Sequence, residues 1–452
     1  MAPEQTKSTP YGGWIPADPA IWKAFFNDLL HNIDATKAHV PAVQAFQDAI
    51  ESDSELVDLF RQTFLQVSPQ SKIKNFDELL YCMDQIVVAA PKFQVAKNDQ
   101  GAEIREPIGA PLYLLFDLLG NTSAGYFLLV KKKLNAPLKN LLNAWADYLR
   151  SPDSVSVLND PDELWFGKHG GFETTEWKPG SFNETFECPD PTAINRGFTS
   201  WDAFFTRKFK PEIRKQRQDA PYPWQPNPGP SLPQSDLGNS QPDGPPHIQP
   251  DPHRGLFIYN ACESTVYRIQ TNVKGRDKFW LKGQPYSIFD ILGRNDDEVA
   301  RSFIGGTVYQ ASLSPYDYHR WHSPVNGVIK AAELIEGSYY AALPDNGTDD
   351  PRGALTRSQS WLTISATRAL IYVEADDKRI GTLVFVGVGM AEISTCDITA
   401  RPGQRVSAGD ELGMFHYGGS SYALIFGPNV NFKVLPEVGE HQLVFAPFAG
   451  VE

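Results

Sequence analysis

Over roughly the first 150 residues, apolar side chains recur every three or four positions, which is the period of an amphipathic helix. An Asp-Pro pair opens segment 18–33, as is typical of the start of a helix. We therefore expect an N-terminal helical domain over residues 1–150. Its helices are expected at 18–33, 41–51, 55–67, 76–90 and 123–150, the last of them interrupted at Pro137.

From residue 255 onward the pattern changes to short apolar runs that are separated by turn-forming residues. Such runs predict strands, and helices followed by strands favour an α+β fold over an alternating α/β fold. Strands are expected at 255–261, 264–270, 306–313, 327–335, 362–366, 369–375, 382–388 and 441–446.

Two segments follow neither pattern. Residues 151–196 are rich in Pro, Gly and Asp, and we interpret them as a connecting segment. Residues 219–254 contain eleven prolines and almost no branched apolar side chain. Because such a composition cannot pack a core, a mobile surface insert is expected there.

Charge and composition exclude several classes of protein. With 41 basic and 54 acidic residues, the formal charge of −13 argues against a nucleic-acid partner. The N-terminus lacks the pattern of a signal peptide, and no apolar run is long enough to cross a membrane. The four cysteines are widely spaced, which favours a reducing compartment. We therefore expect a cytoplasmic protein without integral membrane association.

Residues 316–327, YDYHRWHSPVNG, contain two histidines three positions apart, His319 and His322. They could be polar residues at the rim of a site, a metal-binding pair, or general acids and bases. A metal pair would need further ligands, and the helical H-E-x-x-H pattern is absent. Spacing alone does not decide between these interpretations.

Residues 413–426, GMFHYGGSSYALIF, place Gly-Gly-Ser-Ser between two apolar runs. A hairpin turn would explain the glycines, whereas the G-x-S-x-G elbow of serine hydrolases and the phosphate-binding loop are both absent. A third interpretation is chemical. A serine hydroxyl in a strained turn can attack the preceding glycine carbonyl, with an imidazole as base and a carboxylate as its partner. Elimination then splits the chain and converts the serine into a pyruvoyl group.

Three segments in this order resemble the phosphatidylserine decarboxylase family of pyruvoyl enzymes: FFTRKFKP, YDYHRWHSPVNG and LGMFHYGGSS. The resemblance covers roughly residues 197–452, which it implies to be a catalytic domain with a core of the barrel-sandwich type. The helical region resembles the extra domain of a soluble fungal branch, which includes a tryptophan decarboxylase of psilocybin-type pathways.

The resemblance also implies roles for individual residues. Ser420 matches the serine that becomes the pyruvoyl group, and Gly419 matches the residue before the cut. His322 matches the base of the self-cleavage triad, His319 a histidine used in decarboxylation, and Glu263 the triad acid. Two features depart from the family pattern: Glu263 replaces an Asp, and GGSS at residues 418–421 replaces Leu-Gly-Ser-Thr.

These roles imply a self-processing decarboxylase whose only cofactor is a pyruvoyl group made from Ser420, without a metal. The expected substrate is a free, aromatic amino acid such as tryptophan, with Glu392 as a substrate-binding residue. Phosphatidylserine is the alternative substrate, and a binding protein that has lost the chemistry is a third hypothesis. The expected partners are the cleaved chain 420–452 and, by resemblance, a second copy in a homodimer.

Overall fold

The computed structural model describes residues 13–158, 165–166, 172, 182–220, 256–276, 286–343, 351–392 and 396–452. The proline-rich insert expected at 219–254 lies outside the described residues from residue 221 onward. The expected connecting segment 151–196 is described only in part.

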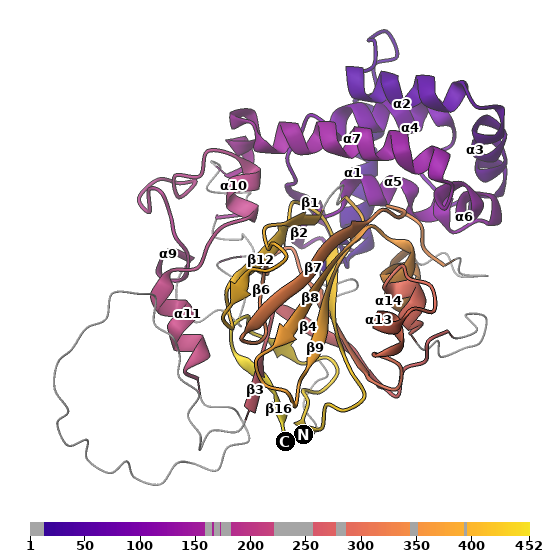
Figure 1. Cartoon of the computed structure of the whole chain (residues 1–452). Coiled ribbons are helices and arrows are strands. Elements are labelled where there is room, and N and C mark those ends of the chain that lie inside the picture. Colours follow the sequence, from indigo (N-terminus) through magenta and orange to yellow (C-terminus); the bar gives the residue numbers. More distant parts are fainter. Residues whose placement is uncertain are drawn as a thin grey trace.

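Seven helices build most of the N-terminal region, above the sheet in the view of Figure 1. The predicted helix start at residue 18 is confirmed, since the Asp18 side chain accepts a hydrogen bond from the Ala20 amide. A short hairpin and a fifth helix between residues 93 and 120 were not expected. The elements are α1 (Pro19–His31), α2 (Pro41–Glu51), α3 (Ser54–Gln66), α4 (Phe76–Ile86), β1 (Phe93–Lys97), β2 (Glu103–Pro107), α5 (Pro111–Gly120), α6 (Ser123–Leu129) and α7 (Lys132–Arg150).

The predicted interruption at Pro137 is wrong, because Pro137 lies inside α7. The break falls instead between Leu129 and Lys132, where α6 ends and α7 begins. A proline leaves the carbonyl four residues earlier without its helical donor. That residue, Lys133, is exposed, so water can bond its carbonyl and the helix tolerates the proline.

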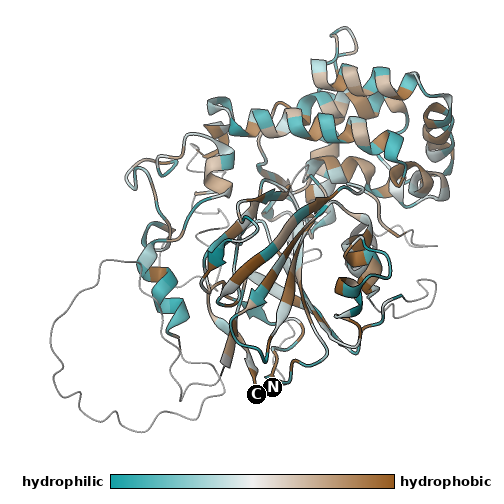
Figure 2. Cartoon of the chain, in the orientation of Figure 1, coloured by the Kyte–Doolittle hydropathy of each residue, from teal (hydrophilic) through white to brown (hydrophobic). Residues whose placement is uncertain are grey.

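An eight-stranded antiparallel sheet forms the centre of the C-terminal half, in the order β11-β7-β8-β9-β13-β5-β4-β15. Its apolar strands appear brown in Figure 2. The order has two ends, so the described strands form an open sheet rather than a closed barrel. The strands are β4 (Ser264–Thr271), β5 (Thr307–Leu313), β7 (Gly327–Ile335), β8 (Arg368–Ala375), β9 (Thr382–Gly389), β11 (Arg405–Val406), β13 (Ser420–Phe426) and β15 (His441–Gln442).

Two three-stranded sheets, ordered β10-β12-β6 and β14-β16-β3, complete the described β-structure, and the α+β class is confirmed. Their strands are β3 (Leu256–Tyr259), β6 (Arg320–His322), β10 (Cys396–Ile398), β12 (Glu411–Phe415), β14 (Phe432–Val434) and β16 (Pro447–Val451). Among the described residues, four short helices lie between α7 and β3: η2 (Pro152–Leu158), α9 (Phe182–Thr185), α10 (Trp201–Phe205) and α11 (Pro211–Gln218). Two more lie between β4 and β5: α12 (Ile288–Ile291) and α13 (Glu298–Arg301).

The strand expected at 362–366 is wrong, because residues 362–365 form the last turn of helix α14 (Pro351–Ser365). A run of five residues does not distinguish a buried strand from a buried helix by periodicity. Leu362 is buried, and α14 contacts β9 and α12. Packing against these neighbours therefore decides the conformation of this run.

The helical region and the large sheet share one hydrophobic cluster, which includes Trp14 and Trp145 from the first part and Val386 and Ile425 from the sheet. A second cluster, with Trp321 among its members, lies within the C-terminal half. Among the described residues, no helix combines the length and hydrophobicity needed to span a bilayer. The shared cluster brings the N-terminal helices against the strands that carry the predicted site.

Candidate active site

The Gly419–Ser420 peptide stands at the entrance to β13, a central strand of the large sheet. Ser420 pairs with Leu313 of β5 on one side and with Gly389 of β9 on the other. Beyond the end of β9, the Met390 amide donates a hydrogen bond of 2.9 Å to the Gly419 carbonyl oxygen. A donor already in place on this oxygen would stabilise negative charge that forms there during nucleophilic attack.

The Ser420 hydroxyl is buried and has no hydrogen-bond partner among the described residues. A buried polar group without a partner is costly, and such groups concentrate where function requires them. Its neighbour Ser421 differs, since the Gln310 side-chain amide donates to the Ser421 hydroxyl at 3.3 Å. Only Ser420 therefore combines a free hydroxyl with a position next to the Gly419 carbonyl.

Gly418 explains one departure from the family pattern. Its φ of 142° lies in a region that residues with a side chain rarely adopt. A leucine at this position would be strained in the same backbone conformation. The glycine is therefore suited to the turn that leads into the Gly419–Ser420 peptide.

His322 ends β6 and is buried, with both ring nitrogens bonded. Nδ1 lies 2.9 Å from the Gly409 carbonyl oxygen, and Nε2 lies 2.9 Å from the Tyr318 hydroxyl. Because a carbonyl can only accept, Nδ1 carries the proton and Nε2 offers its lone pair. Burial lowers the pKa of His322 to about 3, so the ring is a neutral base near neutral pH.

Glu263 is also buried, and its carboxylate forms an ion pair of 2.7 Å with Arg217 of α11. The backbone of its segment lies beside His322, whose amide donates to the Ala261 carbonyl. The His322 ring, however, is bonded by Gly409 and Tyr318 rather than by Glu263 or Ser420. The expected hydrogen bonds of the triad are therefore not formed in this conformation.

Two further groups surround Glu263. One potential metal-ligand atom each from Glu263, Asp317 and His441 lies within 4.8 Å of the other two. His441 Nε2 lies 3.1 Å from an Asp317 carboxylate oxygen. Arg217 already places a positive charge at this cluster, so the two carboxylates have a protein counter-ion.

His319 precedes β6 and lies among aromatic rings. It stacks on Phe205 at a centroid distance of 4.0 Å and meets Trp14 edge-on at 5.8 Å. The Trp14 indole in turn donates to the carbonyl of Leu313, the β5 residue that pairs with Ser420. These contacts connect His319 to the strand beside the Ser420 position, and it remains a candidate for proton transfer.

The FFTRKFKP segment supports the loop that carries both histidines. Arg207 is buried and donates to the carbonyls of Tyr316 and Asp317, at 2.7 and 3.0 Å. Phe205 stacks on His319, and the Thr206 carbonyl accepts from Arg320. Two segments more than a hundred residues apart in the sequence thus form one structural unit.

Glu392 is buried, and its carboxylate accepts hydrogen bonds at both oxygens. Oε1 accepts from the Tyr113 amide of α5 at 2.9 Å, and Oε2 accepts from the Tyr340 hydroxyl at 2.7 Å. Burial raises the pKa of Glu392 to about 7, although these hydrogen bonds act in the opposite direction.

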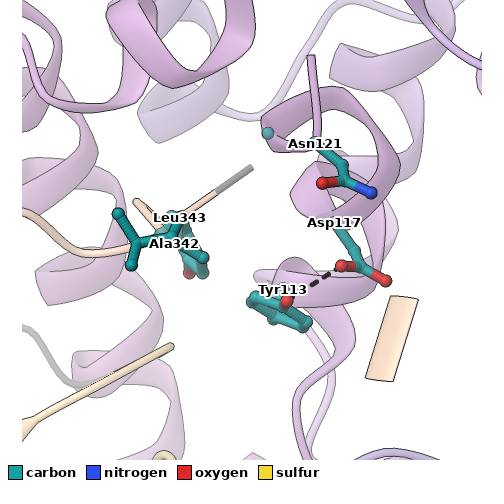
Figure 3. A pocket seen from close by; sticks show the side chains of 7 residues that line it. Tyr113, Asp117, Asn121, Ala342 and Leu343 are labelled. Atoms are coloured by element: carbon teal, nitrogen blue, oxygen red, sulfur yellow. Dashed lines mark hydrogen bonds between the residues drawn. The ribbon is translucent and has the colours of Figure 1, made fainter. Parts of the chain in front are cut away.

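Two recesses lie near Glu392. Tyr113 and Tyr340 line the first, together with Asp117, to which the Tyr113 hydroxyl donates (Figure 3). Glu392 itself lines the second, which adjoins the turn before Gly419. The residues of the second recess are Leu142, Trp145, Ala146, Leu149, Asp202, Glu392, His416 and Tyr417.

Sequence reasoning missed several residues that shape this site. Arg207 belongs to FFTRKFKP, a segment that carried the family resemblance, and Asp317 belongs to the histidine motif, so those motifs contained a signal. Arg217 lies just after FFTRKFKP, outside the resemblance motifs. No sequence signal pointed to Trp14, because its hydrogen-bond partner Leu313 lies 299 residues further along the chain.

Comparisons with known proteins identify the family of this chain. Two family models described as phosphatidylserine decarboxylase match residues 40–173 and 245–446. The decarboxylase iboD of Amanita muscaria is 45% identical over 79% of this chain and 96% of its own length. The L-tryptophan decarboxylase of Psilocybe cubensis is 31% identical over 91% of this chain and 87% of its own.

A more distant relative is similar over a shorter stretch. Phosphatidylserine decarboxylase proenzyme 3 of Schizosaccharomyces pombe is 28% identical over 52% of this chain and 19% of its own length. The coverage and identity of the first relatives show the family of the chain. It belongs to the phosphatidylserine decarboxylase family, and it is a decarboxylase, that is, a carboxy-lyase.

Proposed function

We propose that this decarboxylase cleaves itself between Gly419 and Ser420 and acts on a free aromatic amino acid. The observation that carries the proposal is the buried Ser420 hydroxyl, which has no partner among the described residues and adjoins a carbonyl that already accepts from Met390. The long matches to relatives named L-tryptophan decarboxylase support the substrate class.

In the proposed processing reaction, the Tyr318 hydroxyl first releases His322 Nε2, so that the ring can approach Ser420. Ser420 Oγ then attacks the Gly419 carbonyl carbon and its proton passes to His322 Nε2. The Gly419–Ser420 peptide bond is thereby exchanged for an ester, while the Met390 amide stabilises the oxyanion. Elimination then removes the Cα proton and breaks the Cβ–Oγ bond of residue 420, which leaves a dehydroalanine there and Gly419 as a carboxylate. The enamine of the dehydroalanine tautomerises to an imine, and its hydrolysis by water releases ammonia and leaves a pyruvoyl group at residue 420.

The residues present fit this group, because Ser420 is the buried, unbonded hydroxyl that its formation requires. The group supplies an electron-accepting carbonyl to an amine-bearing substrate. His319, held among Trp14 and Phe205, is proposed to move the proton during decarboxylation. Glu263 is proposed as the acid of the processing site, and its charge is held by Arg217.

Glu392 is proposed to bind the substrate, since it lines the recess next to the turn that precedes Gly419. A carboxylate there attracts the ammonium group of a free amino acid, and Trp145 and Tyr417 offer aromatic surface for its side chain.

The small chain is proposed to stay bound after cleavage. Residues 420–452 include β13, which pairs with both β5 and β9, and β16, which pairs with β3. Removing this chain would expose the centre of the large sheet. The resemblance suggests a homodimer, which light scattering of the purified protein would measure together with the retention of both chains.

The test combines a mass measurement with a substrate panel. The purified protein should give chains 1–419 and 420–452, the latter with a mass that shows the pyruvoyl end. Each proteinogenic amino acid and vesicles of phosphatidylserine are then offered, and CO2 and amine are measured. An intact but active chain would refute self-cleavage, whereas preferred turnover of the vesicles would refute the substrate class.

A further inference from the structure

The turn at residues 390–392 holds the Gly419 peptide from one side. The Met390 amide donates to the Gly419 carbonyl, and the Gly419 amide donates to the Ala391 carbonyl, both at 2.9 Å. These two hydrogen bonds extend the ladder of β9 and β13 past the ends of both strands. The conformation of this turn therefore sets the position of the peptide that is proposed to be cleaved.

This turn has an unusual backbone. Ala391 and Glu392 are consecutive non-glycine residues with positive φ angles, 21° and 72°. Each such residue is strained, and the strain persists only where surrounding contacts hold the backbone in place. The contacts that hold this turn are therefore candidates for control of the reaction at Gly419.

The Glu392 side chain makes two of these contacts. Helix α5 begins at Pro111, and its N-cap residue Ala110 has no side-chain oxygen with which to cap it. Glu392 supplies that acceptor to the Tyr113 amide, although it lies 279 residues away in the sequence. A carboxylate at a helix N-terminus is stabilised by the free amides and by the helix dipole.

The second donor to Glu392 also depends on α5. The Tyr340 ring stacks on Phe116 of this helix, with centroids 4.9 Å apart and planes inclined by 23°. Its hydroxyl then donates to Glu392 Oε2 at 2.7 Å. A continuous set of contacts therefore runs from α5 through Glu392 to the turn and on to Gly419.

We propose that Glu392 is a positioning residue for self-cleavage, which ties the N-terminus of α5 to the turn that holds Gly419. This inference rests on the proposed function, because it presumes cleavage at that bond. Glu392 would position the Gly419 peptide during self-cleavage and bind the substrate only afterwards, so this role and the substrate-binding role proposed above follow one another in time. The helical region would thus control processing without supplying a reacting group.

The test measures the rate of cleavage of newly made chain, by cell-free synthesis with a labelled amino acid, a chase, and a denaturing gel. Glu392→Ala removes both acceptors and should slow cleavage about tenfold or more, because small misplacements of reacting atoms have effects of this order. Glu392→Gln keeps an acceptor for Tyr113 and should cleave at close to the original rate. Tyr340→Phe removes one bond and should slow cleavage severalfold.

Glu106→Ala is the matched control. The Glu106 carboxylate likewise accepts from backbone amides at a helix start, those of Ala17 and Asp18 before α1, and neither amide belongs to the turn at residues 390–392. Each substitution is also placed in a Ser420→Ala chain, where thermal unfolding reports stability in the absence of cleavage. Normal cleavage in Glu106→Ala, at a comparable loss of stability, would support the positioning role.

Three outcomes would overturn the inference. These are an unchanged rate in Glu392→Ala, an equal slowing in Glu106→Ala at equal stability, and a failure of Glu392→Gln to restore cleavage. If Glu392→Ala does not fold, the cleavage rate of Tyr340→Phe is the test instead. An unchanged rate in that variant would overturn the inference. A wild-type chain that never cleaves would instead refute the proposed function itself.

Discussion

The helical region and the large sheet contribute different kinds of contact to the Gly419–Ser420 peptide. Groups proposed to react, including Ser420 and His322, lie on strands or beside them, where register fixes their positions. The helical region instead supplies contacts that hold these strands in place. Three of these contacts are hydrogen bonds. The Trp14 indole donates to the Leu313 carbonyl, the Tyr113 amide donates to the Glu392 carboxylate, and the Gly109 carbonyl accepts from the Tyr417 hydroxyl.

Substitutions in the two regions should therefore have different effects on self-cleavage and decarboxylation. A change to a reacting group should abolish a chemical step while the fold remains. A change to a supporting contact should slow the same step in proportion to the misplacement that it causes. The predictions below test this difference, beginning with the largest expected effect.

Ser420→Ala should remain a single chain and have no decarboxylase activity, because it lacks both the nucleophile and the precursor of the pyruvoyl group. Ser421→Ala is the matched control, since the Ser421 hydroxyl is already bonded by Gln310. It should still cleave. Denaturing gels and CO2 release measure both variants, and cleavage of Ser420→Ala would contradict the proposed position of the cut.

The two histidines should separate processing from decarboxylation. His322→Ala should block cleavage, because it removes the neutral Nε2 base. His319→Ala should still cleave, at least in part, yet release CO2 at a rate lower by about 10²-fold or more, the usual contribution of a positioned acid or base. His39→Ala, whose ring bonds Asp84 in the helical region, serves as a control for general disturbance. The reverse pattern in the two histidine variants would mean that their roles are exchanged.

Substitution of Glu263 tests whether this buried carboxylate takes part in self-cleavage or only stabilises the fold. Glu263→Leu leaves Arg217 buried without its partner and should destabilise the chain by about 3–5 kcal/mol. Glu263→Leu combined with Arg217→Met removes both charges and should regain most of that stability. Urea unfolding in a Ser420→Ala chain measures these changes.

The same double variant is then made with Ser420 in place, and its cleavage is followed on gels. A folded double variant that does not cleave would support Glu263 as the acid of the processing site. Cleavage at the normal rate would assign the pair to the fold alone.

Glu392 should make stability depend on pH. Its pKa in the folded chain is about 7, above the ordinary value of 4.5, so the folded state holds the extra proton between these values. The contribution of Glu392 should therefore be greatest below about pH 4.5 and fall as the pH rises towards 7, by about 1–3 kcal/mol in total. The difference in unfolding free energy between Ser420→Ala chains with and without Glu392→Gln isolates this term.

His322 acts in the opposite direction over part of this range, because its folded pKa of about 3 lies below the ordinary value of 6.5. Both chains in the comparison contain His322, so its contribution cancels. A difference that does not vary with pH would contradict a carboxyl group buried in the manner described.

The smallest effect is expected for substrate affinity. Glu392→Gln should raise KM for the amino acid about three- to tenfold, the range expected when a hydrogen bond loses its charge. Self-cleavage should continue, since the amide still accepts from Tyr113. Glu374→Gln, which changes an exposed carboxylate on β8 that pairs with Lys330, should leave KM unchanged. Equal KM values in the wild-type protein, Glu392→Gln and Glu374→Gln would contradict the proposed role of Glu392 in substrate binding.

Much of the local structure follows from the sequence alone. The four-residue apolar period and the Asp-Pro start of α1 predicted a helix that the structure confirms, and apolar runs predicted β4, β5 and β8. The Gly419–Ser420 pair and the two histidines were recognisable because their chemistry depends on residue type and spacing. Such features are local, so a single stretch of sequence contains the information for them.

The tertiary structure alone decided which of these groups meet. Packing against β9 made residues 362–365 helical, and exposure of Lys133 allowed Pro137 to remain inside α7. Burial gave Glu263 the cation Arg217 as its partner, because a buried carboxylate must find a positive charge or a donor wherever the fold supplies one.

Glu392 shows the same limit, because its hydrogen-bond partner is also remote in the sequence. Its sequence neighbours indicate only a turn after an apolar strand, whereas its partner is the amide of a residue 279 positions earlier. The free amides at the start of α5 need an acceptor, and Ala110 cannot provide one. The sequence by itself determined that a carboxylate stands at position 392 and that the start of α5 has no side-chain cap of its own. Only the folded chain brought the carboxylate and the helix together.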